Sequence, residues 1–258
     1  LRAYAGVVTT LDGRFSTGED VGITEDDVQI MLQESGHFNG KRGVAGDPSP
    51  YAALSTFYAM QAAVSEFMDN GELFGRTVAI KGIGKVGGEL LKLLIGVGAH
   101  VVAADVKPIV IQHIQEKFPQ VKIVSSETVH AESADIFSPC ALSSDLTKGT
   151  VRELKASMVC GAANNQLASA EVGDALYARG IAYVPDYVAN AGGLINVVDE
   201  LETGGYNKKR VLQRIENLKN VLHMIFLVSR QKHQPQSRVA DRLAEDIFRN
   251  GNNPRHVV

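Results

Sequence analysis

Short apolar runs alternate with helical sequence through the middle of the chain. The runs are TVAI at 77–80, HVVAAD at 100–105, VKIV at 121–124, ADIFSPCAL at 134–142, ASMVCGAA at 156–163 and GIAYVPDYV at 180–188. Each is followed by polar or helical residues. Strands that are buried on both faces and separated by helices are typical of a parallel sheet that is covered on both sides. The pattern therefore predicts an α/β fold with a doubly wound parallel sheet of the Rossmann type.

Helical spacing marks the chain on either side of this region. Residues 50–68 place apolar and small side chains at helical steps, and residues 209–232 and 238–248 do the same near the other end. Residues 1–50 are expected to be loop-rich around a single helix. That helix begins at Thr24, whose spacing to Asp27 is that of an N-terminal capping box, and it ends before Gly36.

The charge and cysteine content narrow the class of protein. The chain has 26 Lys and Arg against 29 Asp and Glu, a net charge of −3, so we expect neither nucleic acid nor a membrane surface as a partner. The apolar stretch 90–104 is interrupted by Lys92 and His100 and is too short to span a bilayer. The two distant cysteines, Cys140 and Cys160, predict a reducing compartment, with the cytoplasm as the default, and no metal site.

We expect no secretory signal at the start of the chain as given. Leu1 is not methionine, and the residues that follow it have no basic patch leading into an apolar stretch. We therefore expect the natural start to lie upstream of Leu1.

A glycine-rich turn between the first strand and the next helix is the strongest local motif. The sequence TVAIKGIGKVGGELLKLL holds Gly82, Gly84 and Gly87 in the spacing G-x-G-x-x-G. The first glycine permits a tight turn, the second lets backbone N–H groups approach a pyrophosphate, and the third lets helix and strand pack closely. The N-terminus of the helix adds unpaired N–H groups and a partial positive charge. The motif predicts a dinucleotide site that includes Ile83, Lys85 and Val86.

An acidic residue follows the next strand at the spacing that such sites use. Asp105 lies eighteen residues after Gly87, at the end of HVVAAD, where a carboxylate can bind the 2′-hydroxyl of the adenosine ribose. It would repel a 2′-phosphate, so NAD is favoured over NADP, although Lys107 weakens this preference. Val106 belongs to the same predicted site. The alternative is that the glycines serve only a tight turn and Asp105 is a surface acid.

Seven separated motifs carry a resemblance to a known enzyme family. They are, in order, GRFSTGEDVGIT, GDPSP, GIGKVGGELLKLL, FSPCAL, CGAANNQL, YVPDYVANAGGLINVVDE and VADRLAED. Together they resemble the glutamate, leucine, phenylalanine and valine dehydrogenases, and within them the leucine/phenylalanine/tryptophan branch. The resemblance implies NAD-dependent, reversible oxidative deamination of an L-amino acid to a 2-oxo acid and ammonia. It also implies that the protein binds an amino acid and its 2-oxo acid as small-molecule partners and that it assembles as a homo-oligomer.

The resemblance assigns roles to residues that spacing alone leaves open. Asp20, in GEDVG, is implied to be the catalytic acid/base, whereas a lone Asp in a Gly-rich turn is more often a solvated turn residue. Asn164 and Asn190 are implied to meet the cofactor near the nicotinamide, and Asn190 also the substrate carboxylate; the alternative for Asn190 is a left-handed turn before two glycines. The same crevice is implied to include three further residues, which are Cys140, Ala141 and Ala162.

Three uncharged residues match the family's side-chain pocket. Leu194 and Val197 are three residues apart, so both can face one ligand from a helix, and Gly18 lies two residues before Asp20. The absence of charge argues against glutamate as substrate. Glycine at position 18, where leucine-selective members carry alanine, is interpreted as extra room. This favours phenylalanine or tryptophan, with leucine as the alternative and a non-catalytic NAD-binding protein as a second hypothesis.

The resemblance also implies what the chain lacks. The family's catalytic lysine and the lysine that binds the substrate carboxylate lie in motifs upstream of Leu1, and none of Lys41, Lys81 or Lys85 takes their place. Relatives have a threonine that bonds the cofactor where this chain has Ala52, which leaves Ser49, Ser55 or water to replace the contact. The expected organisation is residues 1–50 as the end of a substrate domain, 51–225 as the NAD domain and 226–258 as helices that return to the substrate domain.

Overall fold

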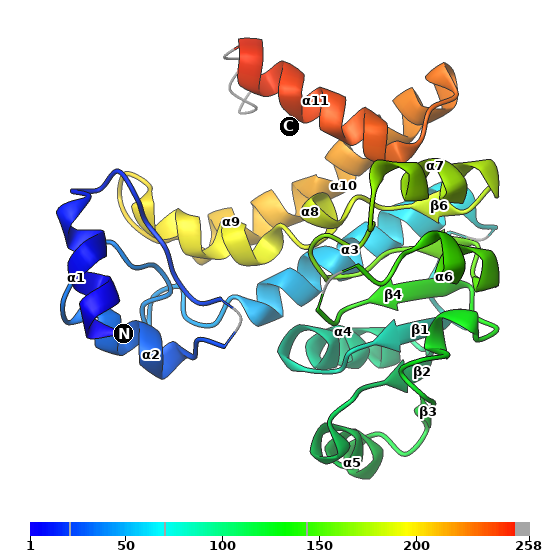
Figure 1. Cartoon of the computed structure of the whole chain (residues 1–258), viewed down its shortest axis with the longest axis horizontal. Coiled ribbons are helices and arrows are strands. Elements are labelled where there is room, and N and C mark those ends of the chain that lie inside the picture. Colours follow the sequence, from blue (N-terminus) through cyan, green and yellow to red (C-terminus); the bar gives the residue numbers. More distant parts are fainter. Residues whose placement is uncertain (21, 70, 143, 251–258) are drawn as a thin grey trace.

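A single parallel sheet organises most of the computed structural model, which describes residues 1–20, 22–69, 71–142 and 144–250 (Figure 1). Within these residues the strand order is β3-β2-β1-β4-β5-β6, with every neighbouring pair parallel. The strands are β1 (Thr77–Lys81), β2 (His100–Ala104), β3 (Lys122–Ile123), β4 (Ile136–Pro139), β5 (Met158–Val159) and β6 (Ala182–Tyr183). The order confirms the predicted doubly wound fold, whose direction of winding reverses between β1 and β4.

Helices cover both faces of the sheet. One face packs on α3 (Ser49–Phe67), α4 (Lys85–Gly96), α5 (Pro108–Lys117) and α10 (Lys208–Lys232), and the other on η1 (Val129–Ala131), α6 (Lys148–Glu153) and α7 (Ala170–Ala178). Within β1, Val78 and Ile80 belong to the first core and Ala79 to the second. Because both faces are buried, the strands are apolar at successive positions rather than at alternate ones.

The C-terminal helices pack on the sheet region. In α10, Leu222, Ile225 and Phe226 are buried in the same core as α3. The helix α11 (Gln236–Asn250) contacts α7 and β6, and Arg238 pairs with Asp174 of α7 at 2.5 Å. The domain limit that we predict at residue 225 therefore lies inside a continuous helix, and residues 251–258 of the expected C-terminal part lie outside the described residues.

The N-terminal lobe (residues 1–20 and 22–48) has a small core of its own. The expectation of one helix here is wrong, because α1 (Arg2–Thr10) precedes α2 (Glu25–Leu32). The first helix has no side-chain cap and contains glycine and β-branched residues, which are weak helix formers. It is stabilised by packing, since Ala5 and Val8 are buried against residues of α2 and its surroundings. The predicted capping box at Thr24 and Asp27 is confirmed, with hydrogen bonds in both directions.

A third group of helices joins the two parts. The helices α8 (Asp186–Ala189), α9 (Gly192–Val198) and η2 (Asp199–Leu201) follow β6 and lead along α3 into α10 (Figure 1). A Cβ atom on Gly192 would lie 2.1 Å from the backbone oxygen of Tyr51, so this glycine allows α9 to approach α3 closely. Among the described helices, none is both long and apolar enough to cross a membrane.

Candidate functional site

The three glycines of the loop after β1 have different surroundings. Gly82 has φ +91°, and a Cβ there would lie 2.8 Å from the backbone nitrogen of Ala141. A Cβ on Gly87 would lie 2.0 Å from the backbone oxygen of Gly82. A Cβ on Gly84 would meet none of the described atoms within 4 Å, although α4 begins directly after it. Packing thus requires the outer two glycines, whereas the middle one leaves open space at the N-terminus of α4, where a phosphate group can approach backbone N–H groups.

Asp105 is held beside this loop. Its carboxylate accepts hydrogen bonds from the backbone N–H of Ile83 and of Lys107, both at 2.9 Å. The two bonds join the end of β2 to the glycine loop and to the start of α5. Val106, the next residue, is exposed. The acid therefore lies at the carboxyl end of the sheet next to the loop, where a ribose hydroxyl can replace one of these donors.

Two residues after β5 meet Asn190, which follows β6 and α8. The Nδ2 group of Asn190 donates to the backbone oxygen of Ala162 at 3.1 Å and to Oδ1 of Asn164. Asn190 has φ −95°, so the alternative of a left-handed turn is wrong for it; Asn165 has φ +53° instead. Asn164 and Asn190 follow the neighbouring parallel strands β5 and β6, so they lie at the same carboxyl edge of the sheet as the glycine loop.

Cys140 completes this wall but shows no sign of being a nucleophile. A Cβ on Gly87 would lie 3.2 Å from the Cβ of Cys140, so the residue after β4 borders the loop. Burial raises the pKa of the Cys140 thiol, and it raises the pKa of Cys160 well above the ordinary value. A thiol in this state is a packing group rather than a thiolate. Among the described residues, no cluster of three or more His, Cys, Asp or Glu side chains has the arrangement of a metal site.

The segment with Asp20 lies against the glycine loop. Its neighbour Glu19 forms an ion pair with the ammonium group of Lys85, the first residue of α4. The backbone oxygen of Asp20 accepts a hydrogen bond from the N–H of Ile23 at 2.9 Å. The structure thus brings the predicted acid/base residue and the predicted cofactor loop to the two sides of one junction between the lobes.

Two of the three predicted pocket residues lie against neighbouring residues of the N-terminal lobe. A Cβ on Gly18 would lie 2.8 Å from the backbone oxygen of Asn39, and a Cβ on Gly40 would lie 4.0 Å from Cγ1 of Val197. Gly18 therefore borders Asn39, and Val197 borders the next residue, Gly40. Leu194, one turn earlier on α9, is 67% exposed. The interpretation of Gly18 as extra room needs correction, because the backbone of Asn39 fills the space that a methyl group would take.

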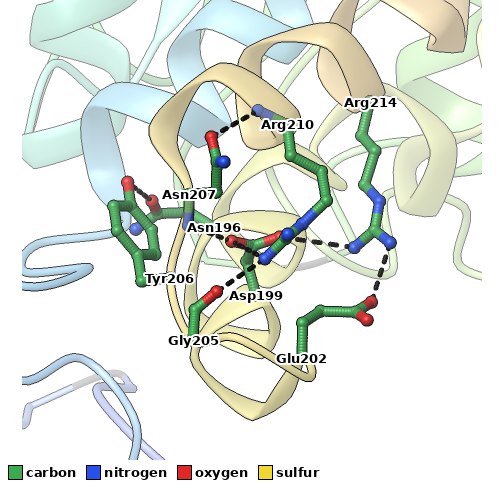
Figure 2. A network of polar contacts seen from close by, with 8 residues as sticks. All are labelled: Asn196, Asp199, Glu202, Gly205, Tyr206, Asn207, Arg210 and Arg214. Carbon is green, nitrogen blue, oxygen red and sulfur yellow. Dashed lines mark hydrogen bonds and ion pairs between the residues drawn. The ribbon is translucent and has the colours of Figure 1, made fainter.

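A buried ion pair fixes the end of α9 (Figure 2). The carboxylate of Asp199 is fully buried and accepts hydrogen bonds from Nε and Nη2 of Arg210 at 2.6 and 2.8 Å, and from the N–H of Asn207 at 2.6 Å. Arg214 lies 3.5 Å from it and pairs with Glu202 at 2.7 Å. Burial by itself raises the pKa of Asp199, but the hydrogen bonds and charges of the two arginines lower it on balance.

Glu200 fixes the same helix end to the N-terminal lobe. Its carboxylate accepts hydrogen bonds from the backbone N–H groups of Gly40, Lys41 and Ala45 at 3.1, 3.1 and 3.0 Å. Asn196 adds a bond from Nδ2 to the backbone oxygen of Ala45 at 3.0 Å. Sequence reasoning missed Glu200 because its partners are backbone groups about 155 positions away. The only signal was the glycine-rich loop NGKRGVAG, whose N–H groups need acceptors.

Three further polar side chains near the glycine loop and α3 have partners within the chain. Lys81 pairs with Asp145 at 2.5 Å, and Lys85 pairs with Glu19. The buried hydroxyl of Ser55 accepts a hydrogen bond from the N–H of Gly192 at 3.0 Å and donates to the backbone oxygen of Ala52 at 3.0 Å. Ser55 therefore serves the contact between α3 and α9.

Known proteins resemble this chain over nearly its whole length. A family model described as Glutamate/Leucine/Phenylalanine/Valine dehydrogenase matches residues 48–245. A leucine dehydrogenase of Bacillus subtilis (strain 168) is 36% identical over 248 residues, which is 95% of this chain and 67% of that protein. A phenylalanine dehydrogenase of Thermoactinomyces intermedius is 37% identical over 261 residues, which is 100% of this chain and 71% of that protein. The crystal structure of L-tryptophan dehydrogenase from Nostoc punctiforme matches with a TM-score of 0.82 at 36% identity. The match covers 97% of this chain and 72% of the chain in that structure.

Proposed function

This chain belongs to the glutamate/leucine/phenylalanine/valine dehydrogenase family, and from that premise we propose that it oxidises an L-amino acid to the 2-oxo acid and ammonia, reversibly and with NAD. One arrangement carries the proposal. The open glycine loop, the fixed carboxylate of Asp105 and the pair Asn164–Asn190 lie at the carboxyl edge of the sheet, and the lobe with Asp20 contacts that loop through Glu19.

The residues present fit a dinucleotide. The space beside Gly84 and the start of α4 would hold the pyrophosphate, together with the backbone of Ile83, Lys85 and Val86, and Asp105 would hold the adenosine ribose beside Val106. The nicotinamide half would lie toward Asn164 and Asn190, with Cys140, Ala141 and Ala162 behind it. A bound NAD supplies the hydride acceptor. The carboxylate of Asp105 disfavours a 2′-phosphate, which supports NAD over NADP.

Asp20 is proposed as the group that moves protons at the substrate nitrogen and at the attacking water. A carboxylate can do this only within hydrogen-bond reach of those atoms, and the contact of its segment with the glycine loop supports that placement. The test is Asp20→Asn, with the exposed turn residue Asp12→Asn as matched control. In a longer, active form that contains the upstream lysines, we expect the first variant to lose at least about a hundredfold in kcat and the second to retain it. Equal activity of Asp20→Asn and the wild type would refute the role.

The proposed substrate has an uncharged side chain, with phenylalanine or tryptophan first and leucine as the alternative. Leu194, Val197 and Gly18 present no charge that could pair with a second carboxylate. Relatives named for leucine, phenylalanine and tryptophan are 36 to 38% identical, so identity does not separate them.

NADH formation at 340 nm with phenylalanine, tryptophan, leucine and glutamate tests this directly. It is best measured on the 258-residue chain and on any longer natural form, because the chain spans about two thirds of the relatives' length and the family's lysines are expected upstream. Aromatic-dependent reduction would support the proposal. Binding of NADH without turnover in either form would favour a cofactor-binding protein instead.

A homo-oligomer is part of the same proposal. The apolar side chains of Tyr4 and Val7 on α1 are exposed, which fits a surface that a larger assembly covers. Sedimentation of the purified protein would show the assembly state, and a monomer at all concentrations would contradict the expectation.

A further inference from the structure

The ion pair between Glu19 and Lys85 joins the two lobes at the edge of the dinucleotide loop. The side chain of Glu19 is 8% exposed, whereas that of Lys85 is 54% exposed. A nearly buried carboxylate requires a cationic partner or several hydrogen bonds, and the ammonium group of Lys85 provides the cation. The contact is made between residues 66 positions apart in sequence and belongs to neither lobe alone.

Several lobe carboxylates act on Lys85 together. The hydrogen bond that the ammonium group of Lys85 donates to Glu19 is the main cause that raises the pKa of Lys85, and the charges of Glu19, Asp47 and Glu25 raise it further. The cationic first residue of α4 thus faces negative charge from the N-terminal lobe. The phosphates of a dinucleotide bound at Gly84 would meet the same ammonium group, which has three N–H donors and can serve two acceptors at once.

Glu19 is badly placed if the cofactor alone is considered. A carboxylate beside a pyrophosphate site weakens anion binding by Coulomb repulsion and by neutralising the nearby lysine. Its position is useful for another reason, because Glu19 directly precedes Asp20 and the ion pair fixes that segment on the rim of the loop.

We propose that Glu19 is a positioning residue that holds Asp20 on the rim of the dinucleotide loop through Lys85, at the expense of cofactor affinity. This inference rests on the proposed function, since it takes the loop as an NAD site and Asp20 as the acid/base residue. Loss of the Glu19 charge is therefore expected to strengthen NADH binding and to weaken turnover.

Binding of NADH by fluorescence titration tests the first half without any need for turnover. We expect Glu19→Gln to bind NADH about three- to tenfold more tightly at low ionic strength, with the gain reduced in high salt. Lys85→Met should bind it more weakly by a similar factor. Asp26→Asn is the matched control, because it makes the same change in net charge and its partner Arg42 lies in the same lobe. It should bind NADH as the wild type does.

Hydrogen exchange at the amides of residues 17–20 tests the second half. We expect faster exchange there in Glu19→Gln and Lys85→Met but not in Asp26→Asn. The exchanged pair Glu19→Lys with Lys85→Glu should restore slow exchange, since the ion pair is re-formed, and should bind NADH more weakly than Lys85→Met because a carboxylate then faces the phosphates. In an active form, Glu19→Gln should lower kcat while KM for NAD falls.

The outcomes separate this inference from the proposed function. If the wild type does not bind NADH, both are overturned. If the wild type binds NADH and Glu19→Gln matches it in affinity and in amide exchange, only the role of Glu19 is overturned. Weaker binding together with faster exchange in Glu19→Gln would show a merely structural ion pair and would also overturn the proposal.

Discussion

An ideal Cβ atom on Gly18 would lie 2.8 Å from the backbone oxygen of Asn39. The two segments are held together by hydrogen bonds from Thr17 N–H to the oxygen of His37 at 3.1 Å and from Asn39 N–H to the oxygen of Thr17 at 2.7 Å. Glycine is therefore required here by the close approach of two backbones. Any effect of this position on substrate choice acts through the placement of Asn39 and Gly40. Gly40 borders Val197 on α9.

Substitution of Gly18 by alanine should destabilise the N-terminal lobe. The added methyl group must displace backbone, so we expect the free energy of unfolding in urea to fall by about 1–3 kcal/mol. Gly36→Ala is the matched control, because a Cβ there meets none of the described atoms within 4 Å. Equal stability of the two variants would contradict the steric account.

The glycine loop allows folding and ligand binding to be separated. Gly84→Ala adds a methyl group in open space at a negative φ, so the stability should change by no more than about 0.5 kcal/mol while NADH affinity falls at least tenfold. Gly87→Ala forces a carbon against the oxygen of Gly82 and should lower the thermal midpoint as well. Unimpaired NADH binding by a folded Gly84→Ala would show that no phosphate approaches there.

Replacement of Asp105 by asparagine should change the choice of cofactor. Ile83 and Lys107 donate to different oxygens of Asp105, and in asparagine an NH2 donor replaces one of these oxygens and would face a backbone N–H. The amide also has no charge to repel a 2′-phosphate. We expect NADH to bind more weakly and NADPH to gain relative to NADH, as measured by the ratio of their dissociation constants. An unchanged ratio would mean that Asp105 does not face the ribose.

Acid should weaken the fold through Asp199. The folded pKa of Asp199 is lowered, so its contribution to stability is complete above its ordinary value near 3.8 and is lost as the pH falls through the folded value. Arg210→Met leaves the buried carboxylate with Arg214 and should cost about 2–4 kcal/mol at pH 7. Because the variant's Asp199 takes up a proton more readily, the difference from the wild type should shrink toward pH 3. Urea unfolding between pH 3 and 7 measures this, and a constant difference would contradict it.

The attachment of α9 to the N-terminal lobe can be tested with two neighbouring glutamates. Glu200→Gln replaces the carboxylate that accepts from the N–H groups of Gly40, Lys41 and Ala45, so we expect faster hydrogen exchange at these amides. Glu202→Gln is the matched control, since Glu202 pairs with Arg214 of α10. In an active form, Glu200→Gln should also change the ratio of kcat/KM for phenylalanine and leucine. If the two variants show the same amide exchange and the same kcat/KM ratio, Glu200 does not set the position of α9 and of its predicted pocket residues.

The sheet and the backbone of the glycine loop could be predicted from the amino-acid pattern. Apolar runs such as 77–80 identify strands because a strand buried on both faces has no polar side, and the glycine spacing at 82, 84 and 87 reflects local backbone limits. The capping box at Thr24 is likewise predictable, because its two residues are three positions apart in the sequence. These features depend on interactions within one element or between consecutive elements, and a linear pattern therefore records them.

The contacts that assemble the candidate site could not be predicted from local patterns and became visible in the folded chain. The short helix α1 has little helical propensity and is stabilised by burial of Ala5 and Val8 in the lobe core, so no local signal marks it. The roles of Glu19 and Glu200 depend on partners 66 and about 155 residues away, and the partners of Glu200 are backbone groups that have no sequence signature. The reason for glycine at position 18 could not be predicted either. It depends on the backbone of Asn39, which lies opposite the α-carbon of Gly18 only in the folded chain.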